Sequence, residues 1–349
     1  MISRKFRVPA IAATAAAITL LAAGCGSGAS SSTTTTTLAK VSGLEKTTLN
    51  VAAVPAMDSA GFFVALHDGL FSQEGLTINY TPAVSSDTVI AGQLKGQYDI
   101  TMGNYVSYIE AQATGETASA GGLDIIDEGS VMEEGSQVIL ALPKSHIDSL
   151  ADLKGKYVAV NAPQNIDQLL LDSTLTDQGI SPTSVHVDAG VPFPSMLTAL
   201  EHGSYDLNGR TVPVDAEVLP EPFASEVEES LGAITVADLD QGATTAFPIE
   251  GAVVTKDWAK ANPNTLQAFV NAFNAGQNIA DSDRAAVETA FESLNGPQNG
   301  QVSDVIASMM ALNTYPIGVD ETRIQRVANV MQQFGVLSKS FNVATMIGS

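Results

Sequence analysis

Cysteine is nearly absent from this chain: among 349 residues there is one, Cys25. One thiol cannot form a disulfide within the chain. Histidine is scarce as well, and the four present lack the H-x-x-x-H or H-x-H spacing of a metal-binding pair; they are His67, His146, His186 and His202. No G-x-S-x-G, P-loop or G-x-G-x-x-G motif stands at a strand-to-helix junction. The sequence therefore predicts no catalytic residue, metal or cofactor, although a catalytic group assembled in space would leave no such pattern.

Basic residues are also few. The chain has 16 lysines and arginines against 38 aspartates and glutamates, which gives a formal net charge of −22. Such a chain repels phosphate backbones, so no nucleic-acid partner is expected. The charge does not identify a ligand, because an acidic surface mainly confers solubility and a pocket sets its own local field.

Long apolar runs are limited to one, at residues 8–23. Arg4, Lys5 and Arg7 precede this run without any acidic residue, and the run is too short for a comfortable permanent membrane span. This pattern is typical of a secretory signal, here residues 1–24. No later run is long enough to cross a membrane, and no repeat of solenoid period is present.

Cys25 follows this run directly. The stretch Leu21-Ala22-Ala23-Gly24-Cys25 resembles the bacterial lipobox, in which the thiol is acylated before cleavage makes the cysteine residue one. The alternative is a leftover thiol in an uncleaved anchor. Residues 30–37 are a polar Ser/Thr run with nothing to bury, so residues 25–46 are predicted to be a lipidated cysteine and a flexible linker. The protein is thus expected on the extracytoplasmic face of the cell membrane.

Removal of the signal changes the charge balance. It takes three of the 16 basic residues and no acid, which leaves 13 against 38 and a formal net charge of about −25. The mature chain would also have no free cysteine for redox or nucleophilic chemistry.

The roughly 300 residues after the linker exceed a typical single core and predict two lobes. Short β-prone runs alternate with segments whose apolar residues recur at helical spacing, and this alternation predicts an α/β fold with mainly parallel sheets flanked by helices. In the first half, strands are expected at residues 49–54, 76–80 and 99–102, and helices at residues 59–68, 86–94 and 105–113. Ser86 is the expected cap of the second of these helices.

The pattern restarts after Gly135 and ends in a helical tail. Strands are expected at residues 138–142, 157–160, 185–187 and 214–219, and helices at residues 166–176 and 195–202. From Phe247 onward, one strand at residues 251–255 precedes helices at residues 265–279, 284–294, 302–312 and 321–334. The apolar residues of the tail helices share one face, as expected of helices packed on an existing lobe.

Four motifs resemble those of the substrate-binding proteins of ABC importers, and they occur here in the same order as in that family. They are residues 69–76 (GLFSQEGL), 94–100 (LKGQYDI), 150–156 (LADLKGK) and 221–224 (EPFA). The subgroup they resemble binds nitrate, alkanesulfonates, taurine and thiamine-pyrimidine precursors, and the resemblance covers about residues 47–340. Each motif alone is weak, so their order and spacing carry the resemblance.

The resemblance implies the fold and the partners. The fold is a two-lobed periplasmic-binding-protein-like clamp, with residues 47–134 plus 240–349 in lobe 1, residues 135–239 in lobe 2, and the helical tail on lobe 1. The function is capture of a small solute by a monomer and its delivery to an ABC permease and, through it, to an ATPase subunit.

Physical reasoning locates the ligand site independently of the family. In open α/β sheets, ligands bind beyond the carboxyl ends of the strands, where helix N-termini present unpaired N–H groups. This rule selects loops that carry the side chains Met57, Asp58, Ser59, Ser85, Ser86, Asn104, Tyr105, Asn161, Gln164, Asn165 and Glu221.

Several of these residues have a purely structural alternative. Asn104 suits a helix cap, Tyr105 suits the core, and Asp58 suits a solvated loop or a cap. Glu221 suits a helix first turn, where the dipole favours an acid. Among residues outside the site, Trp258 is expected in lobe packing and His67 in a surface pair with Asp68.

Arg210 belongs to a departure from the family pattern. Residues 207–213 form a short insertion with an Asn-Gly turn before the strand that leads to the EPFA motif. Arg210 could therefore face the cleft or the solvent, and it is the only cation among the site candidates. The predicted ligand is a small organic solute with a hydrogen-bonding head group. A sulfonate or taurine-like solute ranks first by family frequency, and a pyrimidine suits the amides and acids at least as well.

The alternatives to an importer receptor are weaker. Pyrimidine-branch relatives of the family include a synthase that uses cysteine and histidine, which the composition of this chain argues against. A sensor module on the same fold would leave the same sequence pattern.

Overall fold

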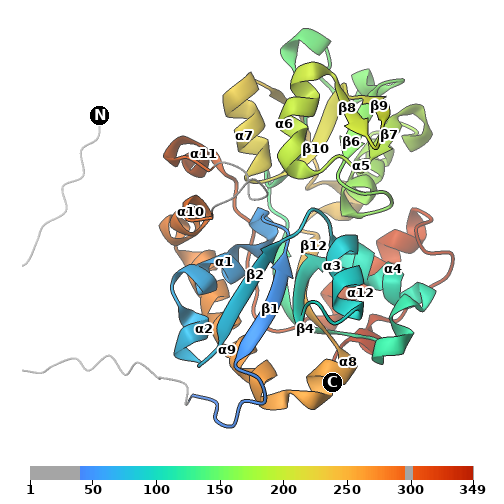
Figure 1. Cartoon of the computed structure of the whole chain (residues 1–349). Coiled ribbons are helices and arrows are strands. Elements are labelled where there is room, and N and C mark those ends of the chain that lie inside the picture. The colour runs from blue at the N-terminus through green and yellow to red at the C-terminus, as the bar shows by residue number, and fades with distance from the viewer. Residues whose placement is uncertain (1–39, 295–301, 349) are drawn as a thin grey trace, which may run out of the picture. The chain divides into compact units, whose positions relative to one another are not determined.

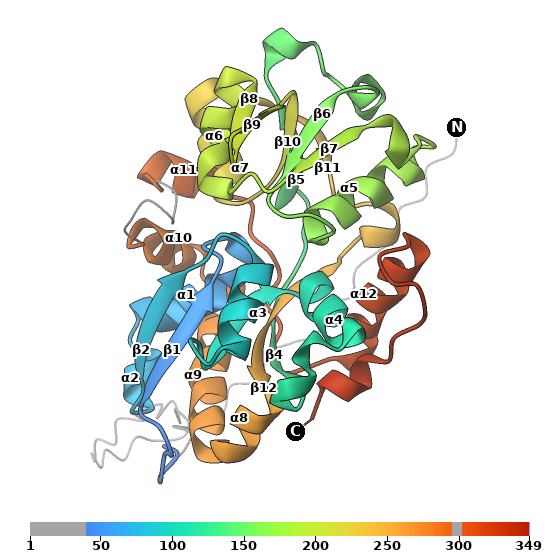
Figure 2. The same cartoon turned by 45° about the vertical axis from the view of Figure 1, so that its right-hand side comes forward.

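Two five-stranded sheets organise the chain (Figures 1 and 2). The computed structural model describes residues 40–294 and 302–348. The signal, Cys25 and the Ser/Thr run therefore lie outside the described residues. The first sheet has the order β2-β1-β3-β12-β4, with β1 (Thr48–Ala53), β2 (Thr77–Pro82), β3 (Ile100–Asn104), β4 (Leu123–Val131) and β12 (Pro248–Thr255).

The second sheet is built from the middle of the chain. Its order is β11-β5-β10-β6-β7, with β5 (Gln137–Ala141), β6 (Tyr157–Val160), β7 (His186–Ala189), β10 (Ala216–Pro220) and β11 (Ile234–Asp238). A separate hairpin joins β8 (Ser204–Leu207) and β9 (Arg210–Pro213). Its turn residues Asn208 and Gly209 both have positive φ, 55° and 85°. The predicted Asn-Gly turn is thus confirmed.

Each sheet contains one strand that opposes the others. β12 is antiparallel to β3 and β4, and β5 is antiparallel to β10 and β11. The remaining strands of each sheet share one direction, so the sheets are mainly parallel, as the βα alternation predicts. The chain is therefore an α/β protein with two sheets flanked by helices.

The helices lie against both sheets (Figures 1 and 2). They are α1 (Ala60–His67), α2 (Leu70–Gln73), α3 (Ser86–Leu94), α4 (Tyr105–Thr114), α5 (Ile166–Asp177), α6 (Phe193–His202), α7 (Phe223–Leu231), α8 (Lys256–Ala261), α9 (Pro263–Ser282), α10 (Arg284–Glu292), α11 (Asp304–Met309) and α12 (Glu321–Gln333). The 3-10 turns are η1 (Met57–Ser59), η2 (Glu116–Ala120), η3 (Pro143–Ser145), η4 (Leu150–Leu153), η5 (Pro182–Ser184), η6 (Gly242–Thr244) and η7 (Val343–Met346). Among the described residues, no helix combines the length and the apolar character needed to span a bilayer.

The alternating direction of the side chains along β1 explains why helices cover both faces of the first sheet. Val51 and Ala53 pack in one apolar cluster with residues of α1 and α9, whereas Ala52 packs in another with residues of α3 and α4. Successive side chains of a strand point to opposite faces, so the three consecutive buried apolar residues Val51, Ala52 and Ala53 need a covering layer on each face.

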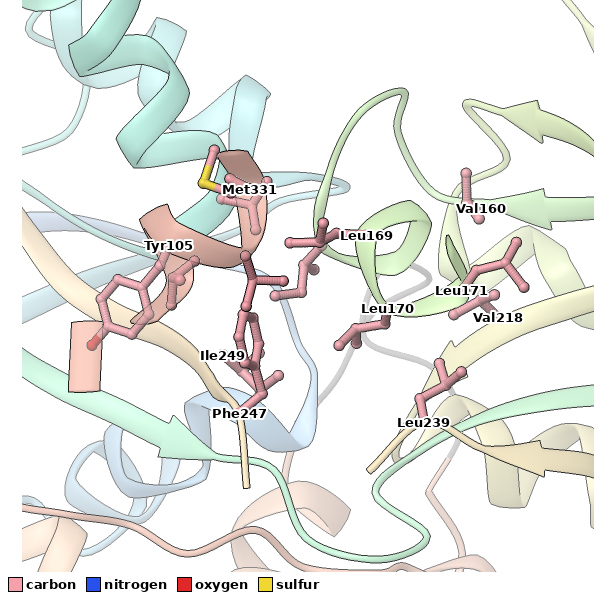
Figure 3. Packing of buried hydrophobic residues seen from close by; sticks show 14 of the residues in the cluster. Tyr105, Val160, Leu169, Leu170, Leu171, Val218, Leu239, Phe247, Ile249 and Met331 are labelled. Carbon is pink, nitrogen blue, oxygen red and sulfur yellow. The ribbon is translucent and has the colours of Figure 1, made fainter. Parts of the chain in front are cut away.

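One apolar cluster joins the two sheets (Figure 3). It contains Leu169 of α5 on the side of the second sheet, together with Met331 of α12 and Ile249 of β12 on the side of the first. Phe247, directly before β12, is fully buried in the same cluster. The elements around the junction are thus held by shared apolar burial as well as by polar contacts.

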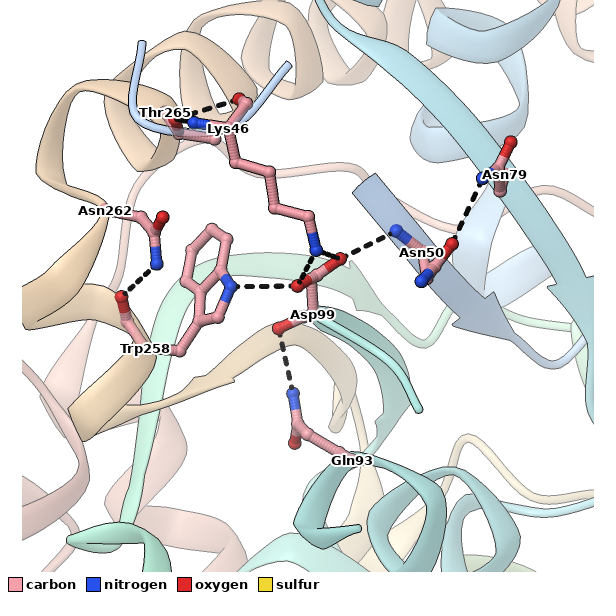
Figure 4. Close-up of polar contacts among 8 residues, drawn as sticks. All are labelled: Lys46, Asn50, Asn79, Gln93, Asp99, Trp258, Asn262 and Thr265. Carbon is pink, nitrogen blue, oxygen red and sulfur yellow. Dashed lines mark hydrogen bonds and ion pairs between the residues drawn. The ribbon is translucent and has the colours of Figure 1, made fainter. Parts of the chain in front are cut away.

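Asp99 anchors the start of β3 through charged and polar contacts (Figure 4). Its carboxylate accepts hydrogen bonds from Lys46 Nζ at 2.7 Å, from the Asn50 backbone N–H at 2.8 Å and from Trp258 Nε1 at 3.0 Å. Trp258 therefore contributes to packing within the first sheet's layer, as expected. His67 and Asp68 also pair at the surface as predicted, with Nδ1 and Oδ1 2.9 Å apart.

The sequence missed several elements. β4, β11, α2, α7 and α8 lack an expected counterpart, and the strands and helices that were expected differ from the observed ones mainly at their ends. The predicted helix cap at Ser86 is wrong, because the N-cap residue is Ser85 and Ser86 begins α3. The Ser86 hydroxyl accepts a hydrogen bond from the Asn104 backbone N–H at 2.9 Å and contacts a different helix.

Candidate functional site

A small pocket lies where elements of the two sheets meet. The first sheet's side contributes Val54 and Asp58 after β1, Ser86 of α3, Asn104 at the end of β3, and Glu250 of β12. The second sheet's side contributes Gln137, Asn161, Ile166, Asp167, Phe193 and Pro220. The free volume between them is about 20 Å³. The pocket thus sits at the strand ends that the general rule for α/β sheets selects.

Asn104 joins the pocket to the first turn of α4. Its Oδ1 accepts a hydrogen bond from the Ser107 backbone N–H at 2.9 Å, which confirms the predicted helix cap. Its Nδ2 donates to the Ser86 hydroxyl at 2.8 Å. Both residues line the pocket, so the cap and a wall position coexist in one side chain.

Asp58 lies in η1 and reaches elements from distant parts of the chain. Its carboxylate accepts hydrogen bonds from Asn313 Nδ2 at 2.9 Å and from Gln137 Nε2 at 3.4 Å. The side chain is buried, and burial raises the pKa of the Asp58 carboxyl although these two hydrogen bonds oppose the shift. Asp58 is therefore a wall residue of the pocket, neither a solvated acid nor a helix cap.

Asp167 lies on the opposite wall, in the first turn of α5. Its Oδ2 accepts hydrogen bonds from the Asn161 backbone N–H at 3.4 Å and from Asn165 Nδ2 at 3.5 Å. Burial, together with the nearby charge of Asp58, raises the pKa of Asp167 to about 7. Asn165 is the N-cap of α5 and also donates to Asn161 Oδ1, which fixes this wall.

Glu250 completes a group of three acids. It belongs to β12, pairs in register with Asn104, and accepts a hydrogen bond from the Ser59 hydroxyl. Burial raises its pKa well above the ordinary range, and the charge of Asp58 raises it further. Asp58, Asp167 and Glu250 are referred to below as the acid triad.

The other predicted site residues lie outside the pocket lining. Tyr105 is fully buried in the core, Met57 is the fully buried first residue of η1, and Ser59 reaches the pocket only through Glu250. Ser85 is a helix cap, and Gln164 lines a different cavity, formed mainly by α3 and α4. Of the predicted site residues, the structure thus places Asp58, Ser86, Asn104 and Asn161 in the pocket lining. The other predicted residues do not line this pocket.

Glu221 lies just before α7 and accepts hydrogen bonds from that helix and from Ala311. Its carboxylate accepts hydrogen bonds from the Ser225 backbone N–H at 3.1 Å and the Ser225 hydroxyl at 2.9 Å, and from the Ala311 backbone N–H at 3.2 Å. Burial raises its pKa to about 7. Its backbone oxygen accepts a hydrogen bond from the Met57 N–H at 2.7 Å. This bond links the two walls beside the pocket.

Arg210 lies on the hairpin and faces solvent. Its side chain is 68% exposed and lies 3.7 Å from Asp188 Oδ1. Of the two alternatives, the structure has Arg210 in solvent and outside the pocket lining. The hairpin that carries it contributes no residue to the pocket lining.

Sequence reasoning missed three polar wall residues: Gln137, Asp167 and Glu250. Two of them had a faint signal, since Glu250 interrupts a largely apolar run and Asp167 lies in the first turn of an expected helix. Only folding shows that these residues face Asp58. Within the described ranges, no group of three or more His, Cys, Asp and Glu residues is placed to hold a metal ion.

Comparison with sequence models of known families identifies the family of this chain. The sequence model of the NMT1-like family matches residues 42–294. The chain belongs to the NMT1-like family. A relative of this NMT1-like chain, the nitrate import ATP-binding protein NrtC of Synechocystis sp., is 24% identical over 295 residues, which cover 80% of this chain and 42% of the relative. The NMT1-like chain thus spans less than half of that relative's length.

Other relatives match at greater coverage. A protein of Haemophilus influenzae named for thiamine biosynthesis is 25% identical over 301 residues, covering 81% of this chain and 85% of that protein. The alkanesulfonate-binding protein SsuA of Xanthomonas axonopodis pv. citri, bound to MOPS, has a TM-score of 0.69 at 19% identity, with 88% of this chain and 99% of SsuA covered. The nitrate-binding protein NrtA of Synechocystis has a TM-score of 0.66 at 15% identity, with 87% of this chain and 85% of NrtA covered. The NMT1-like chain therefore shares its fold with these alkanesulfonate- and nitrate-binding proteins.

Proposed function

We propose that this protein is an extracytoplasmic solute receptor of an ABC importer. The observation that carries the proposal is a polar pocket whose walls come from both sheets and whose carboxyl and amide groups face one another. The fold, shared with an alkanesulfonate-binding and a nitrate-binding protein, supports the same function. The lobes 47–134 plus 240–349 and 135–239 are the moving parts in this proposal.

The pocket must open for a solute to enter. Its free volume of about 20 Å³ admits about one water molecule, whereas solute pockets measure roughly 300–1,000 Å³. Cross-sheet contacts hold the walls together, such as the Met57 N–H to Glu221 oxygen bond of 2.7 Å. Separation of the two walls and their closure around a solute is the motion that receptor function needs.

The solute is a small organic molecule with a hydrogen-bonding head group. Family frequency favours a sulfonate or taurine-like solute, and helix N-termini can supply N–H donors to such a group. The amide and carboxyl lining suits the alternative, a pyrimidine precursor with N–H donors, and the relative named for thiamine biosynthesis fits this alternative. A bare inorganic anion ranks lower, because three buried acids surround the space.

The protein binds and releases its solute without converting it in this proposal. The solved structures that share its fold include binding proteins of transport systems, named for sulfonates and nitrate. The alternatives are a pyrimidine-synthase-like enzyme and a sensor module. Turnover of a bound solute would favour the enzyme, and a gene neighbourhood without a permease and an ATPase would favour the sensor.

A ligand screen tests the receptor function. A solute that binds the folded state alone raises the free energy of unfolding by RT ln(1 + [L]/Kd), about 2.7 kcal/mol at a hundredfold excess over Kd. Thermal unfolding in the presence of sulfonates, nitrate, amines, pyrimidines and aromatic acids should reveal at least one compound that raises the melting temperature. An unchanged melting temperature across the whole panel would remove the support for a solute receptor.

Cys25 is the proposed lipid attachment site. Two or more acyl chains on Cys25 would hold the protein stably at the outer face of the cytoplasmic membrane, within reach of its permease and ATPase partners. Cys25→Ser should therefore move the protein from the membrane fraction to the medium or leave it unprocessed, as measured by fractionation and mass spectrometry. A variant that stays in the membrane at its normal mature mass would contradict lipidation.

A further inference from the structure

The pocket lining is rich in carboxyl groups and, among the described residues, has no basic side chain. Among the residues that the structure describes, the lining contains Asp58, Asp167 and Glu250 and no lysine, arginine or histidine. The three carboxyls come from η1, α5 and β12, so both walls contribute. All three side chains are at least nine-tenths buried. A lining of this composition is unfavourable for a compact anion and favourable for a cation.

The hydrogen-bond partners of the acid triad carry no charge. Within the described chain, Asp58 accepts from the amides of Asn313 and Gln137, and Glu250 accepts from the Ser59 hydroxyl. Asp167 accepts from the Asn161 backbone N–H and the Asn165 amide at 3.4 and 3.5 Å, both long bonds. Buried carboxylates are ordinarily paired with a cation or neutralised by protonation. Among the described residues, no positively charged side chain of the pocket lining therefore balances the acid triad.

A second feature points to a donor on the ligand. Gln137 lines the same pocket and is 1% exposed, and its Oε1 has no hydrogen-bond partner among the described residues. Its Nε2 already donates to Asp58, which leaves the oxygen as the free acceptor. A buried amide oxygen without a donor is unfavourable, so a ligand N–H that reaches it is favoured.

Further acids surround the neighbouring cavity. This cavity of about 330 Å³ is lined by Asp87 of α3, Glu110 of α4 and Glu116 of η2, and it also contacts Gln164 from the second sheet's side. Burial raises the pKa of Glu110, and the charges of Asp87 and Glu116 raise it further. Negative groups around a cavity attract cations and slow the approach of anions.

From these observations we infer that the solute carries a protonated nitrogen, as an ammonium, amidinium or guanidinium group, which the acid triad and Gln137 Oε1 receive. This inference rests on the proposed receptor function and specifies the charge of its solute. Asp58 and Glu250 approach the group from the first sheet's side, and Asp167 and Gln137 approach it from the second. A planar amidinium group would present several N–H donors to these acceptors at once.

Proton exchange on binding follows from the same arrangement. The titratable groups that interact with the triad are the triad members themselves and the buried phenols of Tyr80, Tyr105, Tyr108 and Tyr315. A bound cation stabilises the carboxylate form and therefore releases protons near pH 6.5, below the pKa of about 7 that burial gives Asp167. A bound anion would do the reverse and take up protons.

The test uses probes that share a skeleton and differ in charge. Calorimetry at pH 6.5, in two buffers of different ionisation enthalpy, compares benzamidinium, benzamide and benzenesulfonate, and then propylammonium and propane-1-sulfonate. The cationic probe of at least one set should bind at least about tenfold more tightly than its neutral or anionic counterpart and release protons. Asp58→Asn and Asp167→Asn should each weaken this binding at least about tenfold.

Glu217→Gln is the matched control. Glu217 is a fully buried acid of β10 whose pKa is raised by burial, and it lies outside the pocket lining. Its replacement should leave the affinity for the cationic probe unchanged. Equal losses in this variant and in Asp58→Asn would show a general effect of neutralising buried acids and would overturn the assignment.

Other outcomes separate the two proposals. Tighter binding of a sulfonate probe with proton uptake, or a response to Ca²⁺ or Mg²⁺ without any response to the organic cations, would overturn the inference and leave a receptor in place. The same holds if the wide ligand screen finds only neutral or anionic solutes. If that screen finds no ligand at all, the receptor function itself fails.

Discussion

The free energy of unfolding should fall by about 5 kcal/mol between pH 5 and pH 8 in the ligand-free protein. Burial raises the pKa of Asp167, Glu221 and Asp127 to about 7 and that of Glu217 well above its ordinary value. In the unfolded chain, these carboxyls ionise near pH 4. Between pH 4 and pH 7 the folded protein thus binds more protons than the unfolded chain, and its stability decreases as the pH rises.

The size of the effect follows from linkage. One pKa unit corresponds to 1.36 kcal/mol per group, so the separate shifts sum to more than 5 kcal/mol, and the smaller figure allows for relaxation around buried acids. The melting temperature should fall by about 10 °C over the same range, since about 2 °C corresponds to 1 kcal/mol in a domain of this size. Thermal unfolding followed by circular dichroism at pH 5, 6, 7 and 8 measures both quantities.

Variants identify the responsible groups. Asp167→Asn in the first turn of α5 should flatten the dependence on pH, because the amide keeps the shape of the side chain and cannot ionise. Asp177→Asn is the control, since Asp177 ends the same helix and is exposed. A protein that gains stability from pH 5 to pH 8, or equal flattening in both variants, would contradict the pKa shifts.

Gly276→Val should destabilise the protein by about 3 kcal/mol or more. Gly276 lies where α9 crosses α1, and a Cβ at this position would come within 2.2 Å of the Gly61 backbone oxygen and 2.7 Å of the Ala65 Cβ. Backbone atoms cannot move out of the way without displacing α1. Because η1 leads directly into α1, the displacement should also weaken solute binding at Asp58.

The measurement uses the chain's single tryptophan. Trp258 donates to Asp99 in the first sheet's layer, so its fluorescence reports denaturant unfolding of this part of the molecule. Asn278→Val is the control, because it introduces the same β-branched side chain at an exposed position of α9 and should cost less than about 1 kcal/mol. A Gly276→Val variant no less stable than the control would show that the helices can separate at no cost.

Much of the local structure could be predicted from the sequence. Strands and helices alternate where the hydrophobic period changes, and Asn104 caps its helix because its short amide side chain reaches the first-turn N–H groups. The Asn208-Gly209 turn was predictable for a similar reason, since both residues tolerate positive φ. These features depend on residues that are neighbours in the chain.

The pocket was only partly predictable. Placement at strand ends selected Asp58, Asn104 and Asn161, because this rule needs only the positions of the strands. It missed Glu250, which lies within β12 and reaches the pocket because that strand pairs in register with the end of β3. It also placed Tyr105 at the site, although α4 directs this side chain into the core.

The sequence by itself determined the alternation of elements, the helix cap at Asn104 and the excess of acid over base, since each depends on composition or on residues close in the chain. Tertiary structure alone decided that Asp58, Asp167 and Glu250 meet, that Gln137 leaves an acceptor free beside them, and that Arg210 remains in solvent. The physical reason is that desolvation and Coulomb interactions depend on distance in space. Asp58 raises the pKa of Asp167 and Glu250, each more than a hundred residues away, only after the elements that carry these acids have packed together.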